Sequence, residues 1–358
     1  MKYRQLQASH NVIYLLLTVI ILCIVPSFAL GELKVVFLDV GQGDSTVILC
    51  DGIAMLVDGG RRDNSQYIYT SLKDLGINQL SYVVATHPDS DHIGGLPAAL
   101  EACDIGILYS PTWYSEDAAF LTLKEKAIAK NLPLTFPFPG EKIPLGSATV
   151  TFLGPVMQYG SSNNLSIVLR IDYGNTSFLF TGDAEYQSEA DMLSSSKIWH
   201  ADLLHVGHHG SCTSTSNEFL NVVSPSYAVI SVGKDNTYGL PTEQTLKALC
   251  NNEIAIYRTD LQGVIIAKSD GDQIVIETER SVDPELLIHS SHSPTEETRY
   301  HISKKDEEIT YVGNKKSMKF HYPSCKGVQT MSDKNKVNFY SREEAILLGY
   351  EPCGQCQP

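Results

Sequence analysis

THPDSDHIGG, at residues 86–95, places four potential metal ligands directly after the apolar segment LSYVVA, at residues 80–85. The β-branched and aromatic residues of the apolar segment predict a buried strand. The potential ligands that follow it within six residues are His87, Asp89, Asp91 and His92. Carboxylates and imidazoles crowded at a strand end repel one another and lose hydration unless a cation neutralises them. The stretch therefore predicts a metal site, with an acidic surface turn as the alternative.

Two further strand-like segments end in residues of the same kind. FLFTGD, residues 178–183, ends in Asp183, a carboxylate suited to bridging two cations, and LLHVGHHGS, residues 203–211, carries His208 and His209. Strand ends that converge with Asp and His side chains predict a site for two cations, which suits hydrolysis at phosphorus. We expect Asp91 to orient the attacking water, and one of the two adjacent histidines to contact the phosphate or protonate the leaving oxygen. The residues alone do not separate these two histidines.

Composition indicates a folded and acidic chain. Of 358 residues, 43% are hydrophobic and 19% charged, which is typical of a protein with a sizeable core. The formal net charge is −14; because residues 301–358 carry nine basic and seven acidic residues, the first 300 residues carry −16. This acidity of the first 300 residues argues against a protein that covers nucleic acid through salt bridges alone, since each contact with a phosphate needs a cation nearby. An enzyme that meets phosphates through bound metal ions stays compatible with it.

The first 30 residues are typical of a targeting segment. Lys2 and Arg4 precede an apolar run at residues 12–25, and Ser27 and Ala29 follow at the spacing of a cleavage site. The pattern predicts a signal peptide and a secreted or extracytoplasmic protein. The alternative is an uncleaved anchor at residues 12–30, which is almost long enough to span a bilayer and would associate the chain with a membrane.

The remaining chain divides into three parts by composition. Residues 32–280 alternate short β-branched runs with helical patterns, which predicts an α+β domain with large mixed sheets. Residues 281–308 are rich in Ser, His, Pro, Glu and Lys and predict an exposed linker. Residues 309–358 predict a small separate module, too short to fold on its apolar core alone.

The C-terminal module contains two pairs of soft metal ligands. His321 and Cys325 are separated by three residues, and Cys353 and Cys356 by two. Such pairs can close a tetrahedral Zn²⁺ site that stabilises a small unit. A disulfide in an oxidising compartment is the alternative.

Five motifs, taken in order, resemble a known family. FLDVGQGDS (37–45), LVDGG (56–60), ATHPDSDHIGG (85–95), FLFTGD and HVGHHGS (205–211) resemble the metallo-β-lactamase fold, and more narrowly the hydrolase domain of the ComEC competence (DNA-internalisation) family and its stand-alone secreted relatives. The resemblance implies an αβ/βα sandwich. The tail, with KFHYPSC (319–325) and GYEPCGQC (349–356), resembles the Ada-like metal-binding module, which implies one structural Zn²⁺.

The resemblance also implies a set of metal ligands. His87 and Asp89 would hold one divalent cation, Asp91 and His92 a second, and Asp183 would bridge them, with Asn163 as a further, weaker ligand. Asp89 stands where the wider fold often has His, and an oxygen donor admits Mn²⁺ as well as Zn²⁺. Leu240 stands where relatives commonly have His, which leaves the second site one ligand short unless His205 or His208 replaces it.

These observations predict an exported metal-dependent hydrolase. The main hypothesis is a phosphodiesterase or nuclease that acts on extracellular DNA, as the resemblance and the basic tail suggest. An envelope phosphoesterase acting on a phosphorylcholine or teichoic-acid substituent is the alternative within the same chemistry, which the acidic body favours. The alternative from another functional class is a degenerate metal-binding protein that does not turn over a substrate. Leu240 favours this alternative, because it leaves the second metal site one ligand short. The sequence indicates no obligate protein partner.

Overall fold

The segment before the predicted metal site forms strand β4 (Gln79–Val84) in the first of two large mixed sheets. The structure is a computed structural model and describes residues 31–195, 199–289, 311–339, 345, 350–354 and 356. The first sheet has eight strands in the order β15-β14-β1-β2-β3-β4-β5-β6. Its other strands are β1 (Leu33–Phe37), β2 (Thr46–Cys50), β3 (Ile53–Val57), β5 (Asp104–Tyr109), β6 (Leu134–Thr135), β14 (Ile265–Ser269) and β15 (Ile274–Thr278).

The second sheet has seven strands in the order β13-β12-β11-β10-β9-β8-β7. These are β7 (Lys142–Leu145), β8 (Ala148–Gly154), β9 (Val168–Tyr173), β10 (Thr176–Phe180), β11 (Leu203–His205), β12 (Tyr227–Ile230) and β13 (Ala255–Arg258). Strands β3 to β6 of the first sheet run parallel to one another, and so do β10 to β13 of the second.

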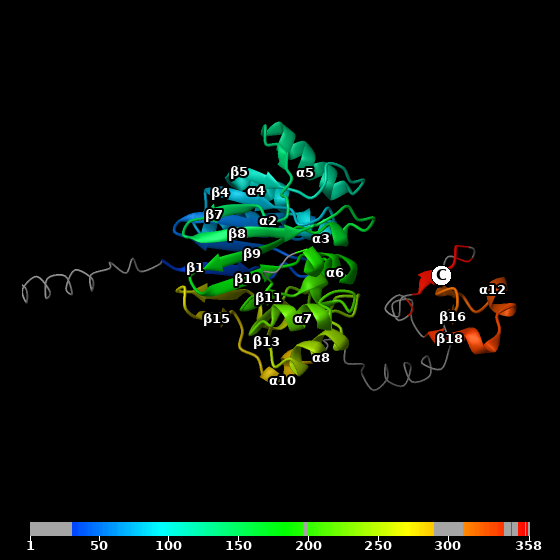
Figure 1. The fold of residues 1–358 in the computed structure, drawn as a ribbon. Helices are drawn as coiled ribbons and strands as arrows, with labels where there is room; N and C mark the ends of the chain where they lie inside the picture. The colour runs from blue at the N-terminus through cyan, green and yellow to red at the C-terminus, as the bar shows by residue number, and fades with distance from the viewer. Residues whose placement is uncertain are drawn as a thin grey trace, which may run out of the picture. The chain divides into compact units, whose positions relative to one another are not determined.

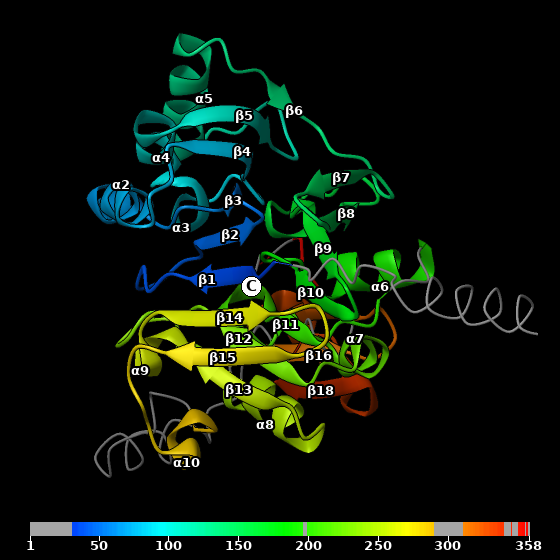
Figure 2. The same cartoon turned by 90° about the vertical axis from the view of Figure 1, so that its left-hand side faces the viewer.

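The two sheets pack face to face, and helices cover their outer faces (Figure 2). Phe37 of β1 and Phe180 of β10 meet in the core between the sheets, with ring centroids 6.1 Å apart. Helices α2 (Ser65–Asp74), α4 (Leu96–Ala102) and α5 (Ala118–Ala129) pack on the first sheet, and α6 (Tyr186–Ser195), α7 (Asn217–Val223) and α8 (Glu243–Asn251) on the second. Each fully buried aliphatic or aromatic side chain contributes roughly 1.5–3 kcal/mol. The expected αβ/βα sandwich is confirmed.

The topology brings the predicted ligands to one edge of the sandwich. Parallel strands end at the same edge of their sheet, so the residues after β3 and β4 lie side by side, and so do those after β10 and β11. In Figure 1, α3 (Ser90–Ile93), which follows β4, and α6, which follows β10, lie on the same side of the two sheets. This edge therefore collects side chains from four strand ends.

The hydrolase domain extends beyond the boundary expected from composition. Residues 281–289, which we expected in the linker, contain α10 (Pro284–Leu287), and Leu287 is buried. The fully buried Arg258 donates to the carbonyl oxygens of Leu287 and His289 and pairs with Asp260 at 2.7 Å. A buried guanidinium needs these acceptors, and this need fixes the segment to the domain. Residues 290–310 lie outside the described part.

The C-terminal module has its own four-stranded sheet in the order β18-β16-β17-β19. Its elements are β16 (Tyr311–Asn314), β17 (Lys319–His321), α12 (Lys326–Gln329), η4 (Asp333–Asn335), β18 (Lys336–Phe339) and β19 (Glu351–Pro352). Two small apolar groups, one around Val312 and one around Phe320, form its interior.

The predicted targeting segment, residues 1–30, lies outside the described residues. Among the helices that the structure describes, none is both long and apolar enough to cross a membrane.

Candidate metal centre

His92 is held from behind by a carboxylate. Its Nδ1 lies 2.8 Å from Oδ2 of Asp58, the residue directly after β3. Asp58 also accepts hydrogen bonds from Thr86, at 2.8 Å from the backbone N–H and 2.7 Å from the hydroxyl. Because a carboxylate can only accept, Nδ1 of His92 carries the proton and Nε2 presents its lone pair.

His209 is held in the same way from the second sheet. Its Nδ1 lies 2.9 Å from the carbonyl oxygen of Ser231 and 3.2 Å from Oδ1 of Asp44. These acceptors again leave the lone pair on Nε2. Histidine ligands of metals usually have such an outer partner, which fixes both tautomer and ring orientation.

The free imidazole nitrogens converge on Asp183. The Nε2 atoms of His87, His92 and His209 lie 3.7, 3.2 and 3.8 Å from the carboxylate oxygens of Asp183. All four side chains are buried, yet neither these Nε2 atoms nor Oδ1 of Asp183 has a hydrogen-bond partner within the part of the chain that the structure describes. Buried donors and acceptors are nearly always satisfied. Four orphaned atoms aimed at one volume fit divalent cations held between them.

Asp89 and Asp91 complete the two sides of this cluster. Oδ2 of Asp89 lies 3.8 Å from Nε2 of His87, and Oδ2 of Asp91 lies 3.5 Å from Nε2 of His209. His87, Asp89 and Asp183 therefore make one group of potential ligands. Asp91, His92, His209 and Asp183 make the other. This division agrees with the one that the resemblance implies, with His209 added to the second group.

The charges within the cluster shift the pKa values of its members. Burial lowers the pKa of His92, but the charges of Asp183 and Asp58 outweigh burial and hold that pKa well above its ordinary value. Burial raises the pKa of Asp183, but the facing His92, His209 and His208 hold it well below the ordinary range. Burial and the neighbouring His92 lower the pKa of His87. A cation entering this cluster would displace the protons of the raised imidazoles.

The structure separates the two adjacent histidines. His208 and His209 both adopt left-handed backbone, with φ of 50° and 54°. Only 2% of the His209 side chain is exposed, against 26% for His208, whose Nδ1 lies 3.2 Å from Oγ1 of Thr213 and whose Nε2 lies 3.7 Å from Asp183. His209 is thus the buried member of the pair, and His208 is the one whose side chain is partly exposed to solvent.

The strained turn that carries these histidines is anchored on both sides. The N–H of His208 donates to the carbonyl of Gly182 at 3.1 Å, and the carbonyl of Gly210 accepts from the N–H of Thr242 at 3.0 Å. Left-handed backbone costs roughly 1–3 kcal/mol for a residue other than glycine and persists only where its surroundings fix it. These two hydrogen bonds hold the histidine turn in its left-handed conformation.

A family model for the metallo-beta-lactamase superfamily matches residues 38–234, more than half of the chain. The chain belongs to the metallo-beta-lactamase superfamily. Its curated relatives include ComE operon protein 3 of Bacillus subtilis, 29% identical over 69% of this chain and 34% of that protein. Competence protein ComA of Neisseria gonorrhoeae is 31% identical over 66% of this chain and 32% of its own length. Recombination protein 2 of Haemophilus influenzae is 29% identical over 77% of this chain and 33% of its own length.

This superfamily member spans about a third of the length of these relatives. The expected relation to the ComEC-like competence proteins is confirmed. Among solved structures, the metallo-beta-lactamase fold protein YhfI from Bacillus subtilis aligns with 66% of this chain and 100% of its own, at 14% identity and a TM-score of 0.46.

Leu240, where this chain departs from its resemblance to the competence family, lies in an apolar cluster. It is 8% exposed and belongs with Ile230 and Val232 to the core beneath α7 and α8. Its backbone N–H and carbonyl both bond the amide of Asn236. His205, the alternative ligand, has Nε2 2.9 Å from Oγ of Ser231 and stacks on Phe37. Nε2 of His209 lies 3.5 Å from Oδ2 of Asp91, in the second group of potential ligands.

Asn163 begins the short helix η2 (Asn163–Leu165), and its neighbour Asn164 is the buried member of the pair. Oδ1 of Asn164 accepts from the N–H of Glu185 at 3.1 Å and of Ser188 at 3.3 Å. Asn164 therefore fixes the segment after Asp183, and a ligand role for Asn163 stays a prediction.

Two site residues were not assigned by the sequence reasoning, although their motifs were recognised. Asp58 of LVDGG accepts from Nδ1 of His92, and Oδ1 of Asp44, in DVGQGD, lies 3.2 Å from Nδ1 of His209. One carboxylate oxygen from each of Asp44 and Asp183 and one ring nitrogen from each of His92 and His209 lie within 4.8 Å of one another. The sequence did carry a signal for such a residue: a carboxylate directly after a strand that neighbours a strand followed by metal ligands.

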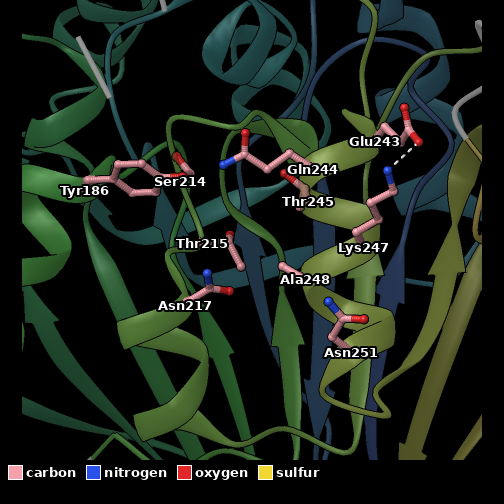
Figure 3. A pocket seen from close by; sticks show the side chains of 10 residues that line it. All are labelled: Tyr186, Ser214, Thr215, Asn217, Glu243, Gln244, Thr245, Lys247, Ala248 and Asn251. Atoms are coloured by element: carbon pink, nitrogen blue, oxygen red, sulfur yellow. Dashed lines mark ion pairs between the residues drawn. The ribbon is translucent and has the colours of Figure 1, made fainter. Parts of the chain in front are cut away.

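A second hollow lies behind the histidine turn. Its volume is about 420 Å³. Figure 3 shows side chains of α8 that line it together with Tyr186, Ser214, Thr215 and Asn217. Lys247 in it pairs with Glu243 at 2.7 Å. Thr245, from the same helix, donates to the carbonyl of Ser211 at 3.1 Å. None of the candidate ligands lines this cavity, so we assign it the role of supporting the turn.

The C-terminal module forms a separate candidate site. One ligand atom from each of His321, Cys325, Cys353 and Cys356 lies within 4.8 Å of the others, and the three cysteines are in the reduced form. Burial and the thiols of Cys325 and Cys353 raise the pKa of Cys356 to about 11, and Nδ1 of His321 is buried without a partner among the described residues. Three sulfurs and one imidazole in this arrangement fit a tetrahedral cation.

Proposed function

We propose that this hydrolase of the metallo-beta-lactamase superfamily is a metal-dependent phosphodiesterase that cleaves DNA. The observation that carries the proposal is the convergence of three buried Nε2 atoms on Asp183, with Asp89 and Asp91 beside them. Oxygen-rich paired sites of this kind suit displacement at phosphorus. The relatives named for competence and recombination support nucleic acid as the substrate.

The residues of the chain divide the work as follows. His87, Asp89, Asp91, His92, His209 and Asp183 would hold two divalent cations, Zn²⁺ or Mn²⁺. Bound there, such cations supply an activated water and stabilise the negative charge that develops on the phosphoryl oxygens. Asp91, with 27% of its side chain exposed, would orient the attacking water. His208, with 26% of its side chain exposed, would give a proton to the leaving oxygen.

We propose that the protein acts outside the cytoplasm, either secreted or held at the membrane by residues 12–30. The C-terminal module would be stabilised by one Zn²⁺. Its lysines, at positions 315, 316, 319 and 326, would add DNA contacts that the acidic body lacks.

The test is hydrolysis of a generic phosphodiester and of single- and double-stranded DNA by the purified chain loaded with Zn²⁺ or Mn²⁺. We expect Asp183→Ala and His87→Ala to abolish activity, and Asp183→Ala to lower metal content more than His209→Ala, because Asp183 contacts both groups. His200→Ala is the matched control, since that side chain is exposed and precedes β11, whose other end leads to the ligands.

Three outcomes separate the hypotheses. Equal activity of the wild type and Asp183→Ala would overturn the hydrolase proposal. Metal binding without turnover of any phosphoester would favour a binding protein. Cleavage of phosphorylcholine esters but not of DNA would favour an envelope substrate.

A further inference from the structure

A hollow lined by two arginines lies beside the metal-binding turn. Its volume is about 500 Å³, and Arg61, Arg62, Asp63 and Ser90 line it. Ser90 stands between Asp89 and Asp91, which belong to the two different groups of potential ligands. Through Ser90 the hollow adjoins the segment that carries these ligands, although none of the ligands themselves lines it.

The arginine pair is fixed to this turn through the backbone. The N–H of Gly59 donates to the carbonyl of His92 at 2.6 Å, and the N–H of Gly95 donates to the carbonyl of Gly60 at 2.9 Å. A Cβ on Gly94 would lie 2.5 Å from the backbone nitrogen of Arg62, so only glycine admits this approach. Both arginines consequently keep a constant position relative to the ligands.

The charges of this hollow favour an anion. Arg61 pairs loosely with Asp63, at 3.8 Å and with 82% of the Asp63 side chain exposed, whereas Arg62 has no ion-pair partner among the described residues. An unpaired guanidinium in a body of net charge −16 is unusual, because acidic partners are plentiful. A planar guanidinium matches the oxygens of a phosphate in bidentate fashion.

We propose that Arg62, with Arg61, binds the phosphate next to the scissile one, so that the site selects a chain of phosphodiesters over an isolated phosphoester. This inference rests on the proposed function and names its substrate class: a DNA strand with at least two adjacent phosphates. The candidate metal centre receives the scissile phosphate, and the arginine hollow receives its neighbour.

The binding test uses a single-stranded phosphorothioate oligonucleotide, which resists cleavage, with the metal-loaded full chain. We expect Arg62→Ala to weaken binding roughly tenfold, equivalent to about 1.4 kcal/mol, and to lower the slope of log affinity against log salt by about 0.7. Arg62→Lys should recover part of the affinity, because it keeps the charge without the fork. Lys130→Ala is the control: Lys130 is an exposed cation that precedes β6, at the opposite edge of the sheet.

The kinetic test compares DNA with a small diester that has one phosphate, bis(4-nitrophenyl) phosphate. We expect Arg62→Ala to raise KM for DNA and to leave both constants for the small diester unchanged. Wild-type affinity and salt slope in Arg62→Ala would overturn the inference, as would equal losses with both substrates. If the wild type cleaves neither substrate, the proposed function fails, while the binding arm still decides whether Arg62 holds a phosphate.

Discussion

Replacing Asp58 with Asn tests whether the metal centre depends on the outer partner of His92. Asp58 uses Oδ1 for the N–H of Thr86, and Oδ2 for both the Thr86 hydroxyl and Nδ1 of His92. Asn keeps the first oxygen but turns an amide donor toward Nδ1. His92 must then accept at Nδ1 and carry its proton on Nε2, the atom that faces Asp183.

The size of the effect follows from burial. Loss of an outer partner typically costs about 10–100-fold in metal affinity, or about 1.4–2.7 kcal/mol. The His92 side chain is 0% exposed, so water cannot replace the lost acceptor, and we expect the upper end of this range. Asp44→Asn is the matched comparison. His209 keeps the carbonyl of Ser231 at 2.9 Å in that variant, and the loss should stay below about tenfold.

The assay is a competition titration of Zn²⁺ and Mn²⁺ against a chromophoric chelator, with thermal unfolding of each metal-free variant to establish that it folds. Wild-type affinity in a folded Asp58→Asn variant would refute the assignment of His92 as a ligand. Equal losses in Asp58→Asn and Asp44→Asn would refute the argument from the second acceptor of His209.

Three further predictions concern the module, a buried acid and Leu240. A chelator should make Cys325, Cys353 and Cys356 reactive toward alkylating agents in the full chain and expose residues 311–339 to proteolysis, because the module has little apolar core; absence of free thiols without reductant would indicate a disulfide instead. Burial raises the pKa of Glu189 to about 7, above its ordinary value of 4.5, so the folded state keeps a proton that the unfolded state loses, and the free energy of unfolding should fall by roughly 3 kcal/mol as pH rises from about 4.5 to 7. Denaturant titrations of Glu189→Gln should lack that slope. Leu240→His should leave metal stoichiometry unchanged and lower the melting temperature, since it places an imidazole in an apolar cluster; a gain of bound metal would restore position 240 as a ligand site.

The position of the metal site could be predicted because strand ends carry topological information. His87 follows β4 and Asp183 follows β10, and parallel strands bring such residues to one edge whatever the loops do. Their residue types then fix the chemistry, since crowded carboxylates and imidazoles need a cation. The division between two cations came from the resemblance alone, and it stays a prediction.

The outer partners could not be assigned in this way, because their role depends on distances across the fold. Asp58 stands 34 residues before His92, and its contact exists only because β3 pairs with β4. Composition equally failed to place the end of the domain, since polar residues near 281–289 conceal the contacts with buried Arg258. Sequence patterns thus predict where in the fold a residue lies more readily than they predict the atoms that it contacts.

The two adjacent histidines show where such reasoning ends and why. Neighbouring residues in a regular strand point to opposite sides, but a turn with two left-handed residues follows no such period. His209 is directed inward by Ser231 and Asp44, and His208 outward toward Thr213, although both belong to the same HHG motif. The strained turn thus lets two adjacent side chains take the two proposed roles, His209 that of a cation ligand and His208 that of a proton donor. A relaxed backbone would direct only one of them toward the phosphate.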